Sequence, residues 1–313
     1  MNRLFGLALA SGVLWCATAS AQVSDGVVKL GVLNDMSSLY ADIGGRGSVL
    51  AAQMAVEDFG GKVLGAPIEI VSGDHQNKPD IGAAIARKWI DTDHVDAIVD
   101  VPTSSVALAI QEVTREKKRL FLMSGPASSD LTGKACSPYG IQWTYDTYAL
   151  AHGTGGALVK QGGDSWFFIT ADYAFGHALE RDTGEAVRAA GGKVLGAVRA
   201  PTSGIPDRRS FAGTEDRAGP DHHLRLVLGQ GRCVACLRQT VHAAKPDRHA
   251  ADLHPGRRLH GGGAVSQSDP AAGTDDADKV VAELRKMKIN DFMTKDGWLR
   301  EDGRVMRDII LRR

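Results

Sequence analysis

The stretch VDAIVDVPTSSVALAIQEVTREKKRLFLMSG, residues 95–125, decides the fold class. Its two ends, VDAIVDV (95–101) and RLFLMSG (119–125), are short β-rich apolar runs of the kind that form buried strands. The residues between them begin with hydroxyl side chains suited to a helix N-terminus and end with cations suited to a C-terminus. A strand, a helix and a second strand in this order predict a parallel βαβ unit.

The same alternation extends to both sides of this stretch. Further strands are predicted for VVKLGVL (27–33), PIEIVSG (67–73), SWFFITA (165–171) and KVLGAVRA (193–200), with helical spacing of apolar residues in the intervals. We therefore expect an α/β fold with parallel sheets and helices on both faces. In such sheets, ligands bind at the C-terminal ends of the strands. A chain of 313 residues is long enough for two lobes, at about 100–200 residues per domain.

The N-terminus predicts export. Arg3 is followed by the apolar run Leu4–Ala17 and by the small residues Ala19-Ser20-Ala21, the pattern of a cleaved secretory signal. Residues 1–21 are therefore predicted to be a signal peptide, with a secreted mature chain beginning at Gln22. A membrane anchor is the alternative, but a bilayer-spanning helix needs about 20 apolar residues.

Composition argues against several classes of function. The formal net charge is zero, so there is no global attraction to nucleic acid or to an anionic membrane. The cysteines form no disulfide framework: Cys16 falls in the signal, Cys136 is isolated, and Cys233 and Cys236 form a single CxxC. The regular half of the chain contains no nucleophile–base pair and no metal-ligand spacing. We therefore expect neither an enzyme nor a metal or cofactor.

Hydroxyl-rich loops follow two neighbouring predicted strands. Thr103-Ser104-Ser105 follows VDAIVDV and opens a helix, and SGPASSDLT (124–132), which contains Ser128, follows the next strand. Hydroxyls and free N–H groups at a helix N-terminus suit a carboxylate or another small anion. The alternative is that these serines only cap helices.

Aromatic side chains and one acid accompany these loops. The segment WTYDTY (143–148) carries Asp146 and Tyr148, and ADYAFG (171–176) carries Tyr173. Together with the hydroxyls they suit an amphoteric ligand: Asp146 for an ammonium or hydroxyl group, and the rings for an apolar part. Each aromatic residue could instead belong to the core.

Five segments in order resemble a known family. They are residues 28–48 (VKLGVLNDMSSLYADIGGRGS), 101–109 (VPTSSVALA), 124–138 (SGPASSDLTGKACSP), 143–155 (WTYDTYALAHGTG) and 166–182 (WFFITADYAFGHALERD). They resemble successive motifs of periplasmic solute-binding proteins that serve ABC importers of branched-chain amino acids. The resemblance covers residues 27–200, and AAGTDDADKVVAELRKM (271–287) resembles a later part of the family.

The resemblance implies a type I periplasmic binding fold, in which two Rossmann-like lobes joined by hinge segments close on a ligand without a chemical step. It assigns Ser104, Ser105 and Ser128 to the ligand carboxylate and Asp146 to the neighbourhood of its amino group. Tyr40, Tyr148 and Tyr173 would line the cleft.

The implied ligand is a branched-chain or other small amino acid, or a related aromatic acid. The implied partner is the membrane permease of an ABC importer, and the protein is expected to be a monomer that binds no nucleic acid. A ligand-binding domain of a sensor or receptor is the alternative with the same fold.

The expected domains are lobe 1 over 22–145, with a return segment over 271–313, and the start of lobe 2 over 146–200. Residues 201–270 depart from the pattern: HAAKPDRHAADLHPGRRLHGGG (242–263) keeps neither strand nor helix periodicity. A metal site, a nucleic-acid patch and a disordered insertion are alternatives for this segment.

A frameshift is the hypothesis that explains more of this segment. Residues 212–221 and 239–249 can be encoded so that one alternative frame reads QAQRTGPD and KQSTQLNLTG, strings that resemble family segments. The second lobe is then expected to be incomplete, and a non-functional relic is a further alternative.

Overall fold

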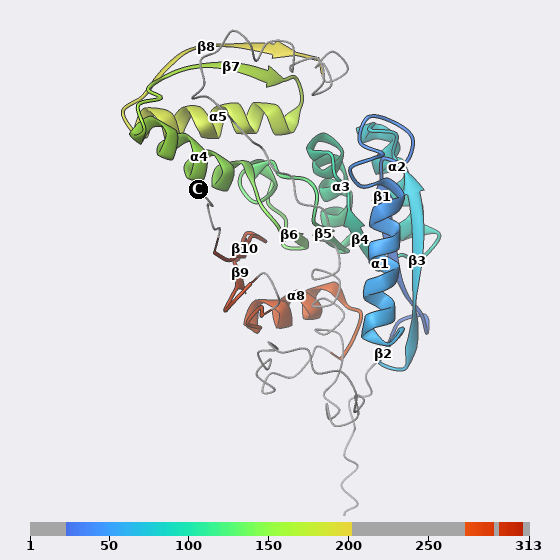
Figure 1. Ribbon diagram of the computed structural model, residues 1–313. Helices are drawn as coiled ribbons and strands as arrows, with labels where there is room; N and C mark the ends of the chain where they lie inside the picture. Colours follow the sequence, from blue (N-terminus) through green and yellow to red (C-terminus); the bar gives the residue numbers. More distant parts are fainter. Residues whose placement is uncertain (1–22, 202–272, 291–293, 309–313) are drawn as a thin grey trace, which may run out of the picture.

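The computed structural model describes residues 23–201, 273–290 and 294–308. They form a larger and a smaller α/β unit (Figure 1). The larger unit contains β1–β6, α1–α3, α8, β9 and β10, and the smaller unit contains α4, β7, α5 and β8. The predictions made for residues 1–21, for Cys233 and Cys236, and for nearly all of residues 201–270 lie outside the described residues.

The larger unit is built on a six-stranded sheet with the order β2-β3-β1-β4-β5-β6. Five strands are parallel, and β2 runs antiparallel to β3. The strands are β1 (Val28–Asn34), β2 (Lys62–Val63), β3 (Ala66–Asp74), β4 (Ala97–Asp100), β5 (Leu120–Met123) and β6 (Gly140–Gln142). This parallel α/β architecture confirms the fold class predicted from residues 95–125.

Helices cover both faces of this sheet. Leu30, Val32 and Leu122 pack with α1 (Gly45–Phe59) and α8 (Ala277–Lys286) on one face. The alternate strand positions, including Leu33, Ile98 and Phe121, pack with α2 (Pro79–Asp91) and α3 (Ser104–Lys117) on the other. Because side chains alternate between two buried faces, the strands read as nearly continuous apolar runs.

The C-terminal segment belongs to the larger unit. In α8, Val280, Val281 and Leu284 are buried in the same core as α1. After it, β9 (Trp298–Leu299) and β10 (Val305–Met306) form an antiparallel pair. The Gln142 N–H donates to the Gly303 carbonyl over 2.8 Å, which places this segment along the edge of β6. The C-terminal segment thus packs against a sheet formed by the N-terminal part of the chain.

The smaller unit consists of α4 (Thr147–Lys160), β7 (Ser165–Ala171), α5 (Ala174–Ala189) and β8 (Lys193–Ala200). The two strands pair in parallel, and α4 and α5 lie between them and the larger unit (Figure 1). On the outer face of this pair Phe167, Ile169 and Leu195 are 60%, 71% and 68% exposed. Among the described residues, no helix has the length and apolarity needed to cross a bilayer.

Candidate functional site

Polar side chains gather where the parallel strands of the larger unit end. The carboxylate of Asp100, at the end of β4, is buried and accepts three hydrogen bonds. The donors are Nδ2 of Asn34 at 2.6 Å and the hydroxyls of Ser48 and Ser124, both at 2.5 Å. These donors come from the end of β1, the first turn of α1 and the loop after β5, so one carboxylate ties three segments at this edge together.

The backbone at this point is strained. Asp100 and Val101 have φ angles of 76° and 57°, a region that is unfavourable for residues other than glycine and most unfavourable for a β-branched one. Strain of this kind persists only where the surroundings enforce it, and it concentrates in ligand-binding loops. Here the three hydrogen bonds to Asp100 hold the turn that leads directly into Thr103-Ser104-Ser105.

The loop after β1 is organised around a second buried acid, Asp35. Burial opposes its ionisation, but hydrogen bonds from the Ser38 hydroxyl and from the N–H groups of Tyr40, Ser38 and Ser37 outweigh this and lower its pKa. The ionised carboxylate therefore holds the loop that presents Tyr40.

The N-terminus of α3 carries no side-chain cap. Thr103 occupies the N-cap position without capping the helix, and its buried hydroxyl has no partner among the described residues. Ser104 is buried and its Oγ accepts from the N–H groups of Ala127 (3.3 Å) and Ser128 (3.2 Å). Ser105 is half-buried beside it. Simple serine capping therefore does not describe this helix start, and its N-terminal dipole is not neutralised by its own side chains.

The two predicted hydroxyl loops do meet. Ser128 is fully buried, and its N–H donates to Ser104 Oγ as described above. Its own hydroxyl accepts from the Asp130 N–H at 3.3 Å and caps the short helix η1 (Ser129–Leu131). Ser104 and Ser128, which follow neighbouring strands, are thus in direct contact, while their contact with a ligand stays a prediction.

Two predicted tyrosines join the units. The rings of Tyr40, in the larger unit, and Tyr173, at the N-terminus of α5, lie 6.4 Å apart between centroids. Burial and a hydrogen bond with Tyr40 raise the pKa of Tyr173, so its phenol is neutral at physiological pH. Tyr148 lies differently: it is 56% exposed on α4 and stacks on His152 at 3.8 Å.

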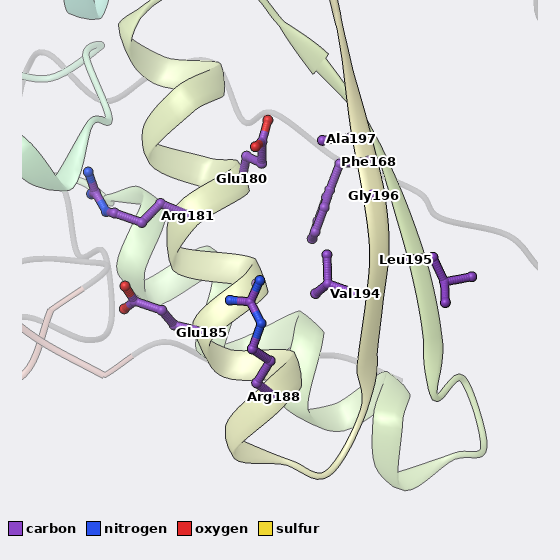
Figure 2. A pocket seen from close by; sticks show the side chains of 10 residues that line it. Phe168, Glu180, Arg181, Glu185, Arg188, Val194, Leu195, Gly196 and Ala197 are labelled. Carbon is purple, nitrogen blue, oxygen red and sulfur yellow. The ribbon is translucent and has the colours of Figure 1, made fainter.

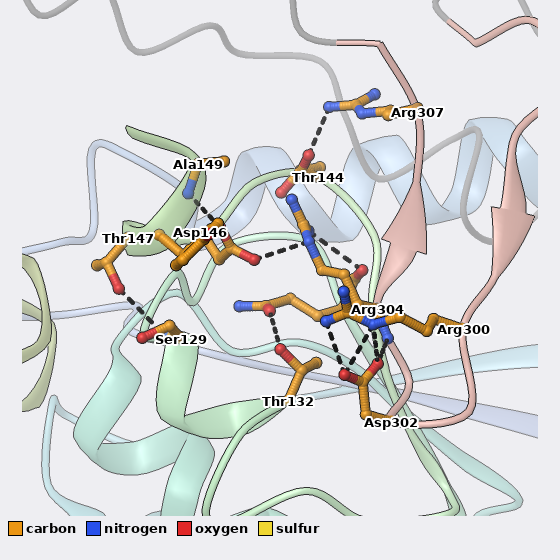
Figure 3. A network of polar contacts seen from close by, with 12 residues as sticks. Ser129, Thr132, Thr144, Asp146, Thr147, Ala149, Arg300, Asp302, Arg304 and Arg307 are labelled. Carbon is orange, nitrogen blue, oxygen red and sulfur yellow. Dashed lines mark hydrogen bonds and ion pairs between the residues drawn. The ribbon is translucent and has the colours of Figure 1, made fainter. Parts of the chain in front are cut away.

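Asp146 is already engaged within the protein. One oxygen accepts from the Ala149 N–H at 2.7 Å and so caps α4, and the other lies 2.8 Å from Nε of Arg304 (Figure 3). Both side chains are buried. The predicted role of Asp146 toward a ligand amino group stays untested, but the described structure uses both of its oxygens for other contacts.

His75 is a buried residue that the sequence did not single out. Its Nδ1 accepts from the Asn77 N–H at 3.0 Å, and its Nε2 has no partner among the described residues. Burial lowers its pKa, although the nearby charges of Asp35, Asp74 and Asp100 act in the opposite direction. The imidazole is therefore neutral at physiological pH.

A cavity of about 390 Å³ lies elsewhere, between α5 and the β7–β8 pair. Figure 2 shows Phe168 and Val194 pointing from the strands toward α5, whereas Leu195 points away. None of the seven predicted ligand residues lines this cavity. We place the candidate site at the strand ends instead, because the uncapped N-terminus of α3 and the buried polar groups lie there. The described residues contain no group of three or more acids, histidines or cysteines suited to a metal.

Each of the two α/β units contains parallel strands, and hydroxyls and a helix N-terminus gather at the carboxyl edge of the larger sheet. This arrangement is typical of proteins that bind a small solute at that edge. The chain belongs to the periplasmic binding protein family, whose profile matches residues 27–244. This confirms the resemblance drawn from residues 28–182 and places the protein in a family of periplasmic solute-binding proteins. The match continues beyond residue 200 into the segment for which a frameshift was hypothesised.

Individual relatives agree with this family. A periplasmic binding protein from Burkholderia mallei is 34% identical, with a TM-score of 0.73 over 90% of this chain and 88% of its own. A branched chain amino acid ABC transporter periplasmic ligand-binding protein from Burkholderia xenovorans is 28% identical, with a TM-score of 0.66 and the same coverage.

A solute-binding protein from Rhodopseudomonas palustris in complex with p-hydroxybenzoic acid is 26% identical, with a TM-score of 0.53 over 61% of this chain and 51% of its own. Leu/Ile/Val-binding protein homolog 6 of Brucella abortus is 24% identical over 196 residues, which are 62% of this chain. The chain matches 49% of that relative, or about half its length.

Proposed function

We propose that the protein is the substrate-binding component of an ABC importer and binds a small organic acid without a chemical step. The ligand class is a branched-chain or other small amino acid, or an aromatic acid. The observation that carries the proposal is the N-terminus of α3, which has no side-chain cap and is flanked by the hydroxyls of Thr103, Ser104 and Ser105.

A carboxylate fits this terminus for electrostatic reasons. The N-terminal N–H groups and the helix dipole favour an anion, and no side chain of the helix occupies that position. Ser104 Oγ already accepts two N–H bonds, so its own proton remains to be donated to a carboxylate oxygen. Ser105 adds a second hydroxyl on the same turn.

The rest of the ligand would contact Tyr40 and Tyr173. Their rings meet across the two units and offer an aromatic surface next to the loop after β1. The engagement of Asp146 by Arg304 supports testing acids that lack an ammonium group alongside amino acids. The complex of the Rhodopseudomonas palustris relative with p-hydroxybenzoic acid supports the same choice.

In this proposal the units correspond to the lobes of a clamshell that closes on its ligand. Lobe 1 would comprise residues 22–145 with the return segment 271–313, and residues 146–200 would begin lobe 2. The partner would be a membrane permease, and the binding protein would act as a monomer in the periplasm.

Isothermal titration with L-leucine, L-valine, benzoate and 4-hydroxybenzoate tests the proposal. At least one acid should bind, and Ser105→Ala should weaken it about tenfold or more, because a hydrogen bond to a charged group is worth about 1.5–3 kcal/mol. Ser165→Ala, an exposed serine of β7, is the matched control and should bind as the unmodified protein does. Absence of binding by all four acids, or equal affinity of the Ser105→Ala variant, would refute the proposal.

A further inference from the structure

The loop that carries Ser128 is held from both units. On the side of the larger unit, Ser104 accepts the N–H groups of Ala127 and Ser128. On the side of the smaller unit, the Thr147 N–H donates to the Ala127 carbonyl over 2.7 Å, and the Thr147 hydroxyl accepts from the Ser129 N–H at 3.0 Å. Figure 3 shows Ser129 and Thr147 facing each other. Both neighbours of Ser128 are therefore bonded to the first residue of α4.

Helix α5 adds charged groups to this contact. Asp182 is 4% exposed, and its carboxylate accepts from the hydroxyls of Ser129 (2.7 Å) and Thr147 (2.6 Å). Arg181 donates from Nη1 to Asp130 at 2.9 Å and from Nη2 to Ser129 Oγ at 2.7 Å. Its Nε donates to Asp182 at 2.9 Å.

The network is complete only in one relative placement of the units. Each of the two hydroxyls donates its single proton to Asp182, so neither has a second proton to offer to another acceptor. A rotation of the smaller unit would carry α5 and Thr147 together away from the loop and break the bonds of Asp182 and Arg181 to Ser129 and Asp130. The buried carboxylate of Asp182 would lose one donor and Arg181 would lose its partners on the loop, so the loop and α5 should move together.

We propose that Arg181 and Asp182 are positioning residues, which hold the Ser128 loop (residues 124–132) in its binding geometry and couple it to the orientation of the smaller unit. The second half of this statement rests on the proposed function, since it assumes that Ser128 contacts the ligand. The first half concerns the loop alone and holds for the ligand-free chain.

Hydrogen exchange on the full ligand-free chain tests whether Arg181 and Asp182 hold the Ser128 loop. In Arg181→Gln, peptides covering residues 124–132 should exchange about tenfold faster. The loop can then open locally without the cost of breaking the bonds from Arg181 to Asp130 and Ser129. Arg188→Gln removes an exposed cation seven residues further along the same helix and should leave this exchange unchanged. Arg181→Lys keeps the charge and should restore part of the protection. Unchanged exchange in Arg181→Gln would overturn the proposal.

Binding measurements test the coupling between the Ser128 loop and the smaller unit. They use whichever of benzoate, 4-hydroxybenzoate, L-leucine or L-valine the unmodified protein binds. Arg181→Gln should lower the affinity about tenfold in the unmodified background but have little further effect in Ser128→Ala, because the two changes act through the same contact. A merely structural role predicts equal losses in both backgrounds, and that result would overturn the coupling.

The two failures are distinguishable. If the unmodified chain binds no acid, the proposed function fails, whereas the exchange comparison still decides whether α5 holds the loop. Should Arg181→Gln not fold, as judged by circular dichroism, the near-isosteric Asp182→Asn is the second variant. It should show the same faster exchange over residues 124–132, and normal exchange there would count against the proposal.

Discussion

Replacing Asp96 with asparagine is expected to stabilise the protein at neutral pH. Asp96 immediately precedes β4, is 9% exposed, and accepts the Lys29 N–H at 2.8 Å. Burial raises its pKa to about 6, and the charges of Asp275 and Asp25 add to the effect, while the Lys29 hydrogen bond and Arg119 oppose it. The folded protein therefore binds a proton at Asp96 more tightly than the unfolded chain does.

The size of the effect follows from the pKa. A rise from 3.8 to about 6 costs the folded state about 3 kcal/mol once the group is ionised in both states, at about 1.36 kcal/mol per pKa unit. Because the folded state binds the proton more tightly, this cost is absent below pH 3.8. It grows as the pH rises toward 6 and is constant above that. Asparagine stays neutral and keeps an acceptor for the Lys29 N–H.

Urea denaturation of the full chain at pH 4 and pH 8 measures the difference. Asp96→Asn should raise the free energy of unfolding by about 3 kcal/mol at pH 8 and by much less at pH 4. Glu69→Gln, which neutralises an exposed carboxylate on β3, is the control and should change stability by less than about 0.5 kcal/mol at either pH. An Asp96→Asn variant that gains nothing at pH 8, or gains equally at both pH values, would refute the reasoning.

Three further variants probe the site and its supports by denaturation. Arg304→Met should lower the free energy of unfolding by about 3–5 kcal/mol, because it leaves the buried carboxylate of Asp146 without its cation. Adding Asp146→Asn should recover part of this loss. A double variant as unstable as the sum of the single variants would contradict this. Ser104→Ala should cost about 1–3 kcal/mol, because two N–H groups of the Ser128 loop lose their acceptor, and an unchanged stability would show that these bonds contribute nothing. Gly303→Ala should cost more than about 2 kcal/mol, since Gly303 has a φ of 88° and a Cβ there would lie 1.9 Å from the Gly140 carbonyl oxygen. Limited proteolysis should then cut near residue 303, and an uncut segment would argue that the backbone shifts to accept the methyl group.

The strand and helix order could be predicted from the sequence because it is encoded locally. In residues 95–125 the apolar runs, the hydroxyls at the helix start and the cations at its end each act within a few positions. The meeting of the Ser104 and Ser128 loops could also be predicted, since the ends of adjacent parallel strands lie at one edge of a sheet.

The partners of the charged groups could not be predicted. Asp146 offers the same carboxylate to a ligand ammonium, to a helix N-terminus and to an arginine, and nothing in TYDTY distinguishes these uses. Arg304 reaches it only because the C-terminal segment packs along β6. Arg181 and Asp182 likewise gave no signal beyond an ordinary helical ERD sequence, because their partners lie on a loop of the other unit.

By itself, then, the sequence determined the α/β class and the family and predicted the loops at which a ligand would be held, because periodicity and turn chemistry act over short distances. Only the tertiary structure decided which hydroxyls and carboxylates are hydrogen-bonded within the protein. That assignment depends on contacts between segments distant in the chain, where packing brings Asp146 to Arg304 and leaves the N-terminus of α3 without a side-chain cap.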